Sequence, residues 1–247
     1  MISRTYANRF EIKYVVETRR LPEIQAGLAD FLEPDPNSSG GNGYYVHSIY
    51  FDSPNYRLYT DKVEGELIRI KPRIRCYRSA PDAPPRELFL ELKGRYDRVV
   101  AKRRTPIDLA LANHLLGTLA PEVNGAAVMS SALAEFDYLC QRYRLSPSVT
   151  VFYHRTPFHG AFYPDMRMTF DRGVRCSLST RLDSPVDTFG YALPPNQAIV
   201  ELKYNEKISG LLLRRLCSLG LQQQTVSKYG ISLETCYRQV YRGRVPV

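Results

Sequence analysis

Cations alternate with aliphatic residues in the segment RIKPRIR at positions 69–75. Side chains of a β-strand point to the two faces of a sheet in turn, so Ile70 and Ile74 share one face. The opposite face then carries a row of cations: Arg69, Lys71, Arg73 and Arg75. Pro72 has no N–H for a ladder, which favours an edge, a bulge or a local break at that position. The segment predicts a β-strand with one strongly basic face.

Three triplets elsewhere place a carboxylate and an ammonium on one strand face and an aliphatic residue on the other. They are Glu11-Ile12-Lys13, Glu91-Leu92-Lys93 and Glu201-Leu202-Lys203. The same spacing relates Lys102 to Arg104, Tyr153 to Arg155, and Arg167 to Thr169 and Asp171. If helices cover the aliphatic faces, the charged faces enclose a polar tunnel. A solvated outer sheet face fits the same alternation, so the pattern alone leaves both arrangements open.

Strands account for most of the predicted secondary structure. The predicted strands are Phe10 to Glu17, Tyr44 to Phe51, Glu66 to Arg78, Glu87 to Arg95, Arg98 to Ile107, Ser148 to Arg155, Met166 to Arg172 and Ala198 to Tyr204. Apolar residues at helical spacing predict helices at Leu21 to Phe31, Ala110 to Leu116, Ser130 to Arg142 and Ile208 to Leu216. This pattern favours a mainly antiparallel α+β fold, an eight-stranded closed barrel with helices packed outside.

The composition indicates one globular domain over residues 1–247, because no linker-like stretch or fixed-period repeat interrupts the chain. The five cysteines are odd in number and never spaced C-x-x-C, so neither a disulfide framework nor a zinc site is expected. The sequence shows neither an apolar leader nor the roughly 18 consecutive apolar residues of a membrane span. We therefore expect a stand-alone cytoplasmic protein without a membrane segment.

The kind of basic residue narrows the choice of ligand. The chain contains 26 Arg and 8 Lys and has a formal net charge of +9. The planar fork of arginine matches two oxygens of a phosphate or carboxylate at once, whereas lysine offers a point charge. An anionic, oxygen-rich ligand is the expected partner.

Nine short blocks together resemble the VTC domain, the polyphosphate polymerase domain of the vacuolar transporter chaperone complex. The blocks are RFEIKY (9–14), SIYFDS (48–53), RIKPRIRCY (69–77), LELK (90–93), KRR (102–104), YHR (153–155), RMTFD (167–171), VELKY (200–204) and SKY (227–229). No single block is specific, but their order and spacing span nearly the whole chain. That family is one of the triphosphate tunnel metalloenzymes, the CYTH-like superfamily, whose fold is an eight-stranded antiparallel barrel around a basic tunnel.

The resemblance implies which side chains hold phosphoryl oxygens in the tunnel. The implied catalytic residues are Arg73, Arg75, Lys93, Arg155, Arg167, Lys203 and Lys228. The implied supporting phosphate-binding residues are Lys13, Tyr153 and Ser227, and the strand faces add Arg69, Lys71, Lys102 and Arg104.

The resemblance also implies a divalent metal, Mn²⁺ or Mg²⁺, with Glu201 as its main ligand. Glu11 and Glu91 are secondary candidates that could instead orient neighbouring lysines. Many tunnel hydrolases carry E-x-E-x-K on the first strand, whereas Arg9 stands at the first of these positions here. One acidic ligand is therefore absent, which favours a polymerase over a hydrolase.

The expected activity is a metal-dependent polyphosphate polymerase that transfers the γ-phosphate of ATP, or of another nucleoside triphosphate, to a growing polyphosphate chain. An inorganic triphosphatase or polyphosphatase is the nearest alternative, and a non-catalytic polyphosphate or inositol-phosphate binder is another. Nucleic-acid binding is disfavoured, because the chain has no Trp and no aromatic residues interleave the cations at 69–75. His154 alternates with Arg155 and should face away from the tunnel, and the stretch YFDSPNY (50–56) is interpreted as structural.

Overall fold

An antiparallel sheet dominates the structure, a computed structural model that describes residues 9–36, 38, 41–96, 99–117, 130–205 and 207–241. The sheet contains ten strands within these ranges. They are β1 (Arg9–Glu17), β2 (Leu32–Pro34), β3 (Tyr44–Asp52), β4 (Ile68–Arg78), β5 (Glu87–Tyr96), β6 (Val99–Ile107), β7 (Ser146–Gly160), β8 (Arg167–Ser177), β9 (Gly190–Tyr191) and β10 (Gln197–Asn205). All their pairings are antiparallel, which confirms a mainly antiparallel α+β fold.

Helices connect and cover the strands. They are α1 (Leu21–Gly27), α2 (Arg57–Val63), α3 (Leu109–Gly117), α4 (Ser131–Tyr143), α5 (Gly210–Ser218) and α6 (Lys228–Tyr241), with 3₁₀ turns at Thr18–Arg20, Ala29–Phe31 and Val186–Thr188. Helix α4 starts where the Ser130 side chain accepts a hydrogen bond from the Leu133 N–H, and Ser209 caps α5 in the same way. No helix in the described ranges is long and apolar enough to cross a bilayer.

The predicted strands all occur, and they form the main path of the sheet as β1, β3 to β8 and β10. The short strands β2 and β9 are additional and pair with β7 and β8. The predicted start of β6 at Arg98 lies outside the described residues. The predicted helices correspond to α1, α3, α4 and α5, whereas α2 and α6 are additional.

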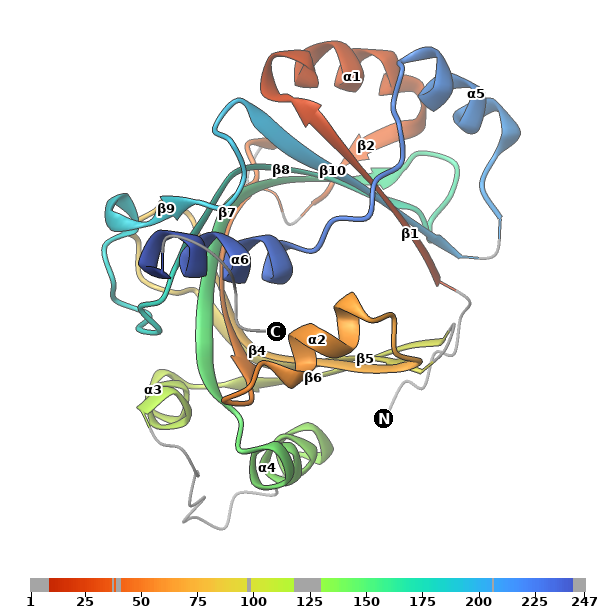
Figure 1. The fold of residues 1–247 in the computed structure, drawn as a ribbon. Coiled ribbons are helices and arrows are strands. Elements are labelled where there is room, and N and C mark those ends of the chain that lie inside the picture. The colour runs from red at the N-terminus through yellow and green to blue at the C-terminus, as the bar shows by residue number, and fades with distance from the viewer. Residues whose placement is uncertain are drawn as a thin grey trace.

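The curved sheet is open, so the expected closed barrel is wrong (Figure 1). The strand order is β1-β10-β8-β7-β3-β4-β5-β6, and within the described residues β1 and β6 are edges that do not pair with each other. The prediction of eight antiparallel strands therefore holds, but their closure into a ring does not.

The chain between α5 and α6 occupies part of the β1 edge. Gln223 forms a β-bridge with Tyr14, and the Gln224 N–H donates to the Lys13 carbonyl oxygen at 2.8 Å. Leu221 packs in an apolar cluster on the outer face of the sheet, whereas Val226 packs in a cluster on the inner face. The segment thus passes the β1 edge and carries α6 to the concave side of the sheet.

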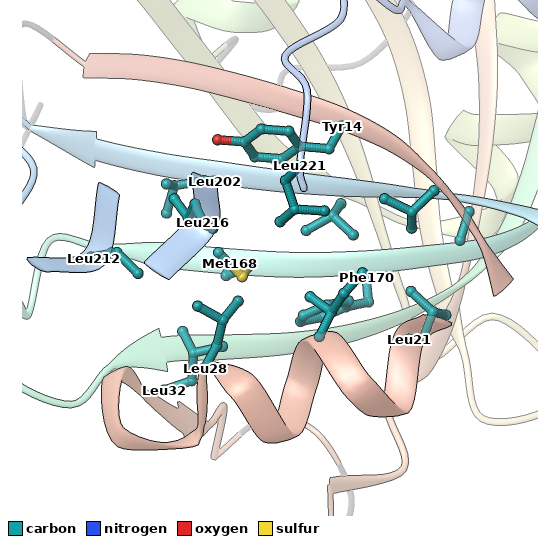
Figure 2. Close-up of a cluster of buried hydrophobic side chains, with 14 of the residues drawn as sticks. Tyr14, Leu21, Leu28, Leu32, Met168, Phe170, Leu202, Leu212, Leu216 and Leu221 are labelled. Atoms are coloured by element: carbon teal, nitrogen blue, oxygen red, sulfur yellow. The ribbon is translucent and has the colours of Figure 1, made fainter. Parts of the chain in front are cut away.

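Two apolar clusters hold helices against the outer face of the sheet. Helices α1 and α5 cover β1, β8 and β10, where Leu28 and Leu212 pack with Met168 and Leu202 (Figure 2). These four side chains have 0% exposure, and burying one of them stabilises the fold by about 1.5–3 kcal/mol. Helices α3 and α4 cover β4 and β5 in the same way.

A third apolar cluster lies on the concave face, where α6 packs across β7, β8 and β10 (Figure 1). Tyr229 and Leu233 of α6 pack there with Val151, Val174 and Ile199. Helix α6 therefore fills part of the interior with an apolar core and leaves the rest to the charged residues.

An irregularity in β8 marks the boundary between the apolar and charged parts of the concave face. The register between β7 and β8 shifts after Phe152, opposite Gly173, which has a φ of +59°. Glycine adopts this left-handed conformation without the strain that a Cβ would add. Asp171 and Val174 both reach the concave face as a result, although strict alternation would separate them.

Candidate functional site

The charged residues of the alternating strands lie on the concave side of the sheet. Their aliphatic neighbours Ile12, Ile74, Leu92 and Leu202 pack in the outer clusters under the helices. Of the two arrangements that the alternation leaves open, the structure therefore has the charges inside. We call this surface the charged face; it comprises Glu11, Lys13, Lys71, Arg73, Arg75, Glu91, Lys93, Lys102, Arg104, Arg155, Asp171, Glu201, Lys203 and Lys228.

Glu91 of β5 organises one half of the charged face. Its Oε2 accepts hydrogen bonds from Nε and Nη2 of Arg73 at 2.8 and 2.6 Å, and lies 3.8 Å from Arg75 Nε. Its Oε1 lies 2.8 Å from Lys102 Nζ and 3.7 Å from Arg104 Nε. Burial acts to raise the pKa of Glu91, but Arg73 and Arg75 outweigh it and hold the pKa far below its usual range. We call Glu91 and these four cations the arginine half.

Lysines face one another across three neighbouring strands beside the arginine half. Lys71 of β4 is directly opposite Lys93 of β5, which is directly opposite Lys102 of β6. Like charges in register destabilise a sheet. Burial is the main cause that lowers the pKa of Lys71 and of Lys102 to about 8. Lys93 and Lys102 are each paired with a carboxylate, whereas Lys71 donates to the neutral Ser227 hydroxyl, so the row keeps positive charge that a bound polyanion would neutralise.

Glu201 of β10 lies at the centre of the other half. Its Oε1 is 2.5 Å from Lys203 Nζ, and its Oε2 is 3.7 Å from Lys228 Nζ. Lys13 of β1 is its direct partner in the strand register. Burial alone would raise the pKa of Glu201, but these lysines hold it well below its usual range. The carboxylate is therefore ionised and enclosed by ammonium groups.

Glu11 connects β1, one edge of the open sheet, to β5, the strand next to the other edge. Its Oε1 is 2.8 Å from Lys13 Nζ, whereas its Oε2 is 3.0 Å from Nζ of Lys93 on β5. Burial and the nearby Glu201 carboxylate act to raise the pKa of Glu11, but the surrounding lysines lower it to about 2. Side chains thus bridge the concave space where the backbone ladder does not.

Asp171 of β8 completes this second half. It accepts a bidentate pair of hydrogen bonds from Arg155 at 2.7 and 2.8 Å, and Lys228 Nζ lies 2.6 Å from its Oδ2. Its side chain has 0% exposure. Burial acts to raise the pKa of Asp171, but Arg155 and Lys228 lower it overall. We call Lys13, Lys203, Lys228 and Arg155, with their three carboxylates, the lysine half.

The start of α6 brings Ser227 and Lys228 to the site. Ser227 Oγ accepts a hydrogen bond from Lys71 Nζ at 3.2 Å, which ties α6 to β4. The Lys228 ammonium lies 5.1 Å from the ring centroid of Tyr153, and the Arg155 guanidinium lies 5.2 Å from it. Tyr153 therefore lies beneath two of the predicted phosphate-binding cations.

Two predicted residues lie away from the two halves. Arg69 is directly opposite Arg95 near the start of β4, and burial is the main cause that lowers its pKa. Arg167 is half exposed, and its Nη1 lies 3.5 Å from Asp35 Oδ2. Both are on the face predicted for them but belong to its rim.

Ser48 and Tyr50 of β3 also contact the site, although the sequence interpretation did not include them. Arg75 Nε donates to Ser48 Oγ at 3.0 Å, and Arg73 Nη1 donates to the Tyr50 hydroxyl at 2.8 Å. Alternation in SIYFD could have identified them, because Ser48 and Tyr50 share the face opposite Ile49.

His154 faces away from the charged face, as the alternation predicts. Its Nδ1 accepts a hydrogen bond from Arg172 Nε at 3.2 Å, and its ring meets the edge of Tyr45 at a centroid distance of 4.9 Å. These contacts assign it to the outer surface of the sheet.

The carboxylates of the lysine half have the chemistry that Mn²⁺ and Mg²⁺ prefer, which is hard oxygen. The described ranges contain no cluster of three His, Cys, Asp or Glu side chains that could cage a metal. Glu201 and Glu11 interact with each other, yet both are also paired with lysines. These residues fit an ion that takes one or two protein carboxylates and its remaining ligands from substrate phosphates and water, as Mg²⁺ often does.

The chain belongs to the VTC domain family, whose sequence model matches residues 8–237. This confirms the resemblance to that family seen in the sequence. No curated protein matches the chain.

Solved structures resemble the chain at low sequence identity, and one of those described here shares its fold. An adenylate cyclase-like protein of Bacillus halodurans is 12% identical with a TM-score of 0.51, over 88% of this chain and 92% of its own. A similar protein of Vibrio parahaemolyticus is 12% identical with a TM-score of 0.43, over 90% and 96%. A Mimivirus capping enzyme triphosphatase is 10% identical with a TM-score of 0.35, over 88% and 91%. The similarity to the Bacillus halodurans protein shows a common fold alone.

Proposed function

We propose that the chain is a metal-dependent polyphosphate polymerase, acting as a single domain over residues 1–247. Its substrates would be ATP or another nucleoside triphosphate and a growing polyphosphate chain. The observation that carries the proposal is the row of Lys71, Lys93 and Lys102, held in register inside the sheet beside the arginine half. A linear phosphate chain supplies repeated negative charge along such a row. Membership of the VTC family supports polymerisation as the reaction.

To catalyse this reaction, the protein has to position the phosphates and neutralise their charge. Phosphoryl transfer passes through a largely dissociative transition state, in which preorganised cations stabilise the equatorial oxygens. Glu91 and Tyr50 fix the guanidinium of Arg73, so its remaining N–H groups are oriented before a substrate arrives. In this proposal Arg73 and Arg75 hold the γ-phosphoryl group of the nucleotide.

The acceptor is the terminal oxygen of the polyphosphate chain, held by Lys203, Lys228 and Arg155. That oxygen attacks the γ-phosphorus in line and forms the new P–O bond, while the bond to the β-phosphate oxygen breaks and the nucleoside diphosphate leaves. The chain grows by one phosphate, and no protein nucleophile takes part. A divalent ion at Glu201 and Glu11 would supply additional neutralisation of the phosphate oxygens.

Product analysis tests the proposal. The purified protein is incubated with ATP and Mn²⁺, and polyphosphate, free phosphate and ADP are measured. Long-chain polyphosphate together with ADP is the expected result. Free phosphate without polyphosphate would instead identify a triphosphatase or polyphosphatase, and absence of turnover with every divalent ion would leave a polyphosphate-binding protein.

A matched pair of variants connects the activity to the charged face. Arg73→Ala should abolish turnover, whereas Arg181→Ala removes the same charge from an exposed pair with Asp183 and should leave turnover unchanged. Equal activity of the two variants would remove Arg73 from the catalytic set.

A further inference from the structure

Tyr50 lies at the junction of the arginine half and α6. It belongs to β3, and its side chain points to the concave face, where its hydroxyl accepts a hydrogen bond from Arg73 Nη1 at 2.8 Å. Its ring stacks on Tyr229 of α6 at a centroid distance of 5.0 Å. The residue is only 6% exposed. The phenol is therefore held in one place from two sides.

The proton of the Tyr50 hydroxyl has no acceptor within the described residues. A phenol donates one hydrogen bond and accepts others, and the contact with Arg73 uses only its capacity to accept. Glu91, the carboxylate of the arginine half, forms ion pairs with Arg73 and Lys102, and within the described residues no hydrogen bond joins it to Tyr50. A buried donor without an acceptor is unfavourable, and a bound anion would supply the acceptor.

The charges around Tyr50 favour the same ligand. Burial acts to raise the pKa of the Tyr50 phenol, but Arg73 and Arg75, with Lys71 beyond them, lower the pKa to about 8. The hydroxyl therefore still carries its proton at neutral pH, and it is a more acidic donor than an ordinary tyrosine. Acidic donors form stronger hydrogen bonds to charged acceptors.

We propose that Tyr50 is a further substrate-binding residue, whose hydroxyl donates a hydrogen bond to the phosphoryl oxygen held by Arg73. The proposal rests on the proposed function, because it concerns the same phosphate-binding face. In this arrangement Arg73 and Tyr50 act as adjacent donors on one oxygen-rich group. Tyr229 supports the phenol from behind through the stacked ring.

A different role for Tyr50 would be to orient Arg73 without touching the ligand. A double-mutant cycle separates the two roles. If Tyr50 acts only through Arg73, Tyr50→Phe has no effect once Arg73 is replaced. If Tyr50 contacts the ligand, the loss persists in that background.

The experiment is titration calorimetry with inorganic tripolyphosphate in metal-free buffer at pH 7. Tyr50→Phe should weaken binding about ten-fold or more, the usual effect of losing a hydrogen bond to a charged group. The loss should persist in Arg73→Ala, and also in Arg73→Lys, which keeps a cation beside Glu91. The control is Tyr45→Phe on the outer face of the same strand, where the ring stacks on Phe152; it should bind like the unchanged protein.

The outcomes distinguish this inference from the proposed function. Unchanged affinity of Tyr50→Phe, in a protein that otherwise binds tripolyphosphate, would overturn the inference alone. A loss that disappears in both Arg73 backgrounds would reduce Tyr50 to a positioning residue. Absence of tripolyphosphate binding by the unchanged protein would overturn the proposed function, and the role of Tyr50 with it.

Discussion

The arginine half and the lysine half of the charged face both hold cations inside a curved sheet, but they are assembled differently. The arginine half comes from β4, β5 and β6, which follow one another in the chain and pair as successive hairpins. One buried carboxylate, Glu91, joins its four cations. The lysine half combines β1, β7, β8 and β10 with the start of α6, and it uses three carboxylates.

The difference teaches that the same charge pattern can rest on local or on distant structure. In the arginine half, neighbouring strands bring the charges together and a bidentate contact to Arg73 fixes them. In the lysine half, Lys228 reaches Asp171 and Glu201 from α6, and the segment that precedes α6 passes along the β1 edge. We therefore expect the first half to depend on a single ion-pair centre and the second to depend on the placement of α6.

The largest effect is expected from Glu91→Gln, which tests the single centre of the arginine half. The substitution leaves the surrounding cations without a counter-charge inside the protein, and breaking a buried ion pair in this way costs about 3–5 kcal/mol of unfolding free energy. Urea unfolding measures the change. The control Asp183→Asn removes an exposed carboxylate and should leave the stability unchanged. Equal stabilities would contradict the assignment of Glu91 as the centre.

The next effect concerns catalysis in the lysine half, where Glu201→Ala should reduce turnover by at least about 10²-fold. Glu201 is the residue best placed to share a divalent ion with the substrate, and such electrostatic contributions commonly have this size. Metal-free binding of tripolyphosphate should not weaken, because the variant removes a negative charge from an anion site. Turnover and calorimetry on the same preparation check both statements, and weaker metal-free binding would show that Glu201 has a structural task instead.

Lys228→Met tests whether the lysine half depends on α6. Turnover should fall by about 10²-fold through loss of one preorganised cation. The fold should persist, because Arg155 still neutralises Asp171 through two hydrogen bonds. Steady-state rates and thermal unfolding are measured beside Lys207→Met, an exposed lysine that serves as the control. Full activity of Lys228→Met would show that the positive charge at the start of α6 does not contribute to catalysis.

The smallest effect is a pH dependence that comes from Lys102 of the arginine half and from Lys71 and Tyr50 beside it. Lys71 and Lys102 have pKa values lowered to about 8, chiefly by burial, so both lose charge as the pH rises through 8. Tyr50, whose pKa is also about 8, becomes negative in the same range. Affinity for tripolyphosphate should therefore fall by about ten-fold between pH 7 and 9.5. In Lys71→Met the decline should be shallower, and an identical slope would exclude Lys71 as a contributor.

The contribution of Lys71 to stability has the opposite sign. Its folded-state pKa of about 8 lies below the value of about 10.4 for an unfolded lysine. Between these values the unfolded chain binds more protons, so this contribution to the stability of the unliganded protein rises with pH. Unfolding of the unchanged protein and of Lys71→Met across this range isolates it.

Most of the fold could be predicted because its strands follow a period of two and its outer helices follow a period near 3.6. Helix α6 could have been predicted as well. Its buried side is formed by residues that recur at helical spacing: Tyr229, Leu233, Cys236 and Tyr237. Closure of the sheet was not predictable in this way. Alternation along a strand records which face is covered, but it does not record whether the first and last strands of the sheet meet.

The site was predictable for the side chains that alternate on strands. The cations of β1, β4, β5, β6 and β10 lie on the charged face as expected from their spacing. Asp171 illustrates the limit, because its role depends on Lys228 arriving from α6 and on the shift in β8 at Gly173. A pattern of residue types contains neither contact.

The pairing of β1 with β10 joins strands from opposite ends of the described chain, with Arg9 opposite Asn205. Closing so long an intervening loop lowers the chain entropy before the hydrogen bonds between β1 and β10 can form. Sheets rich in such distant pairings fold slowly. During synthesis β1 is made before its partner β10, so its backbone groups stay without a strand partner until most of the chain has emerged. Refolding should accordingly show β1 gaining hydrogen-exchange protection last, well after the β4 to β6 hairpins.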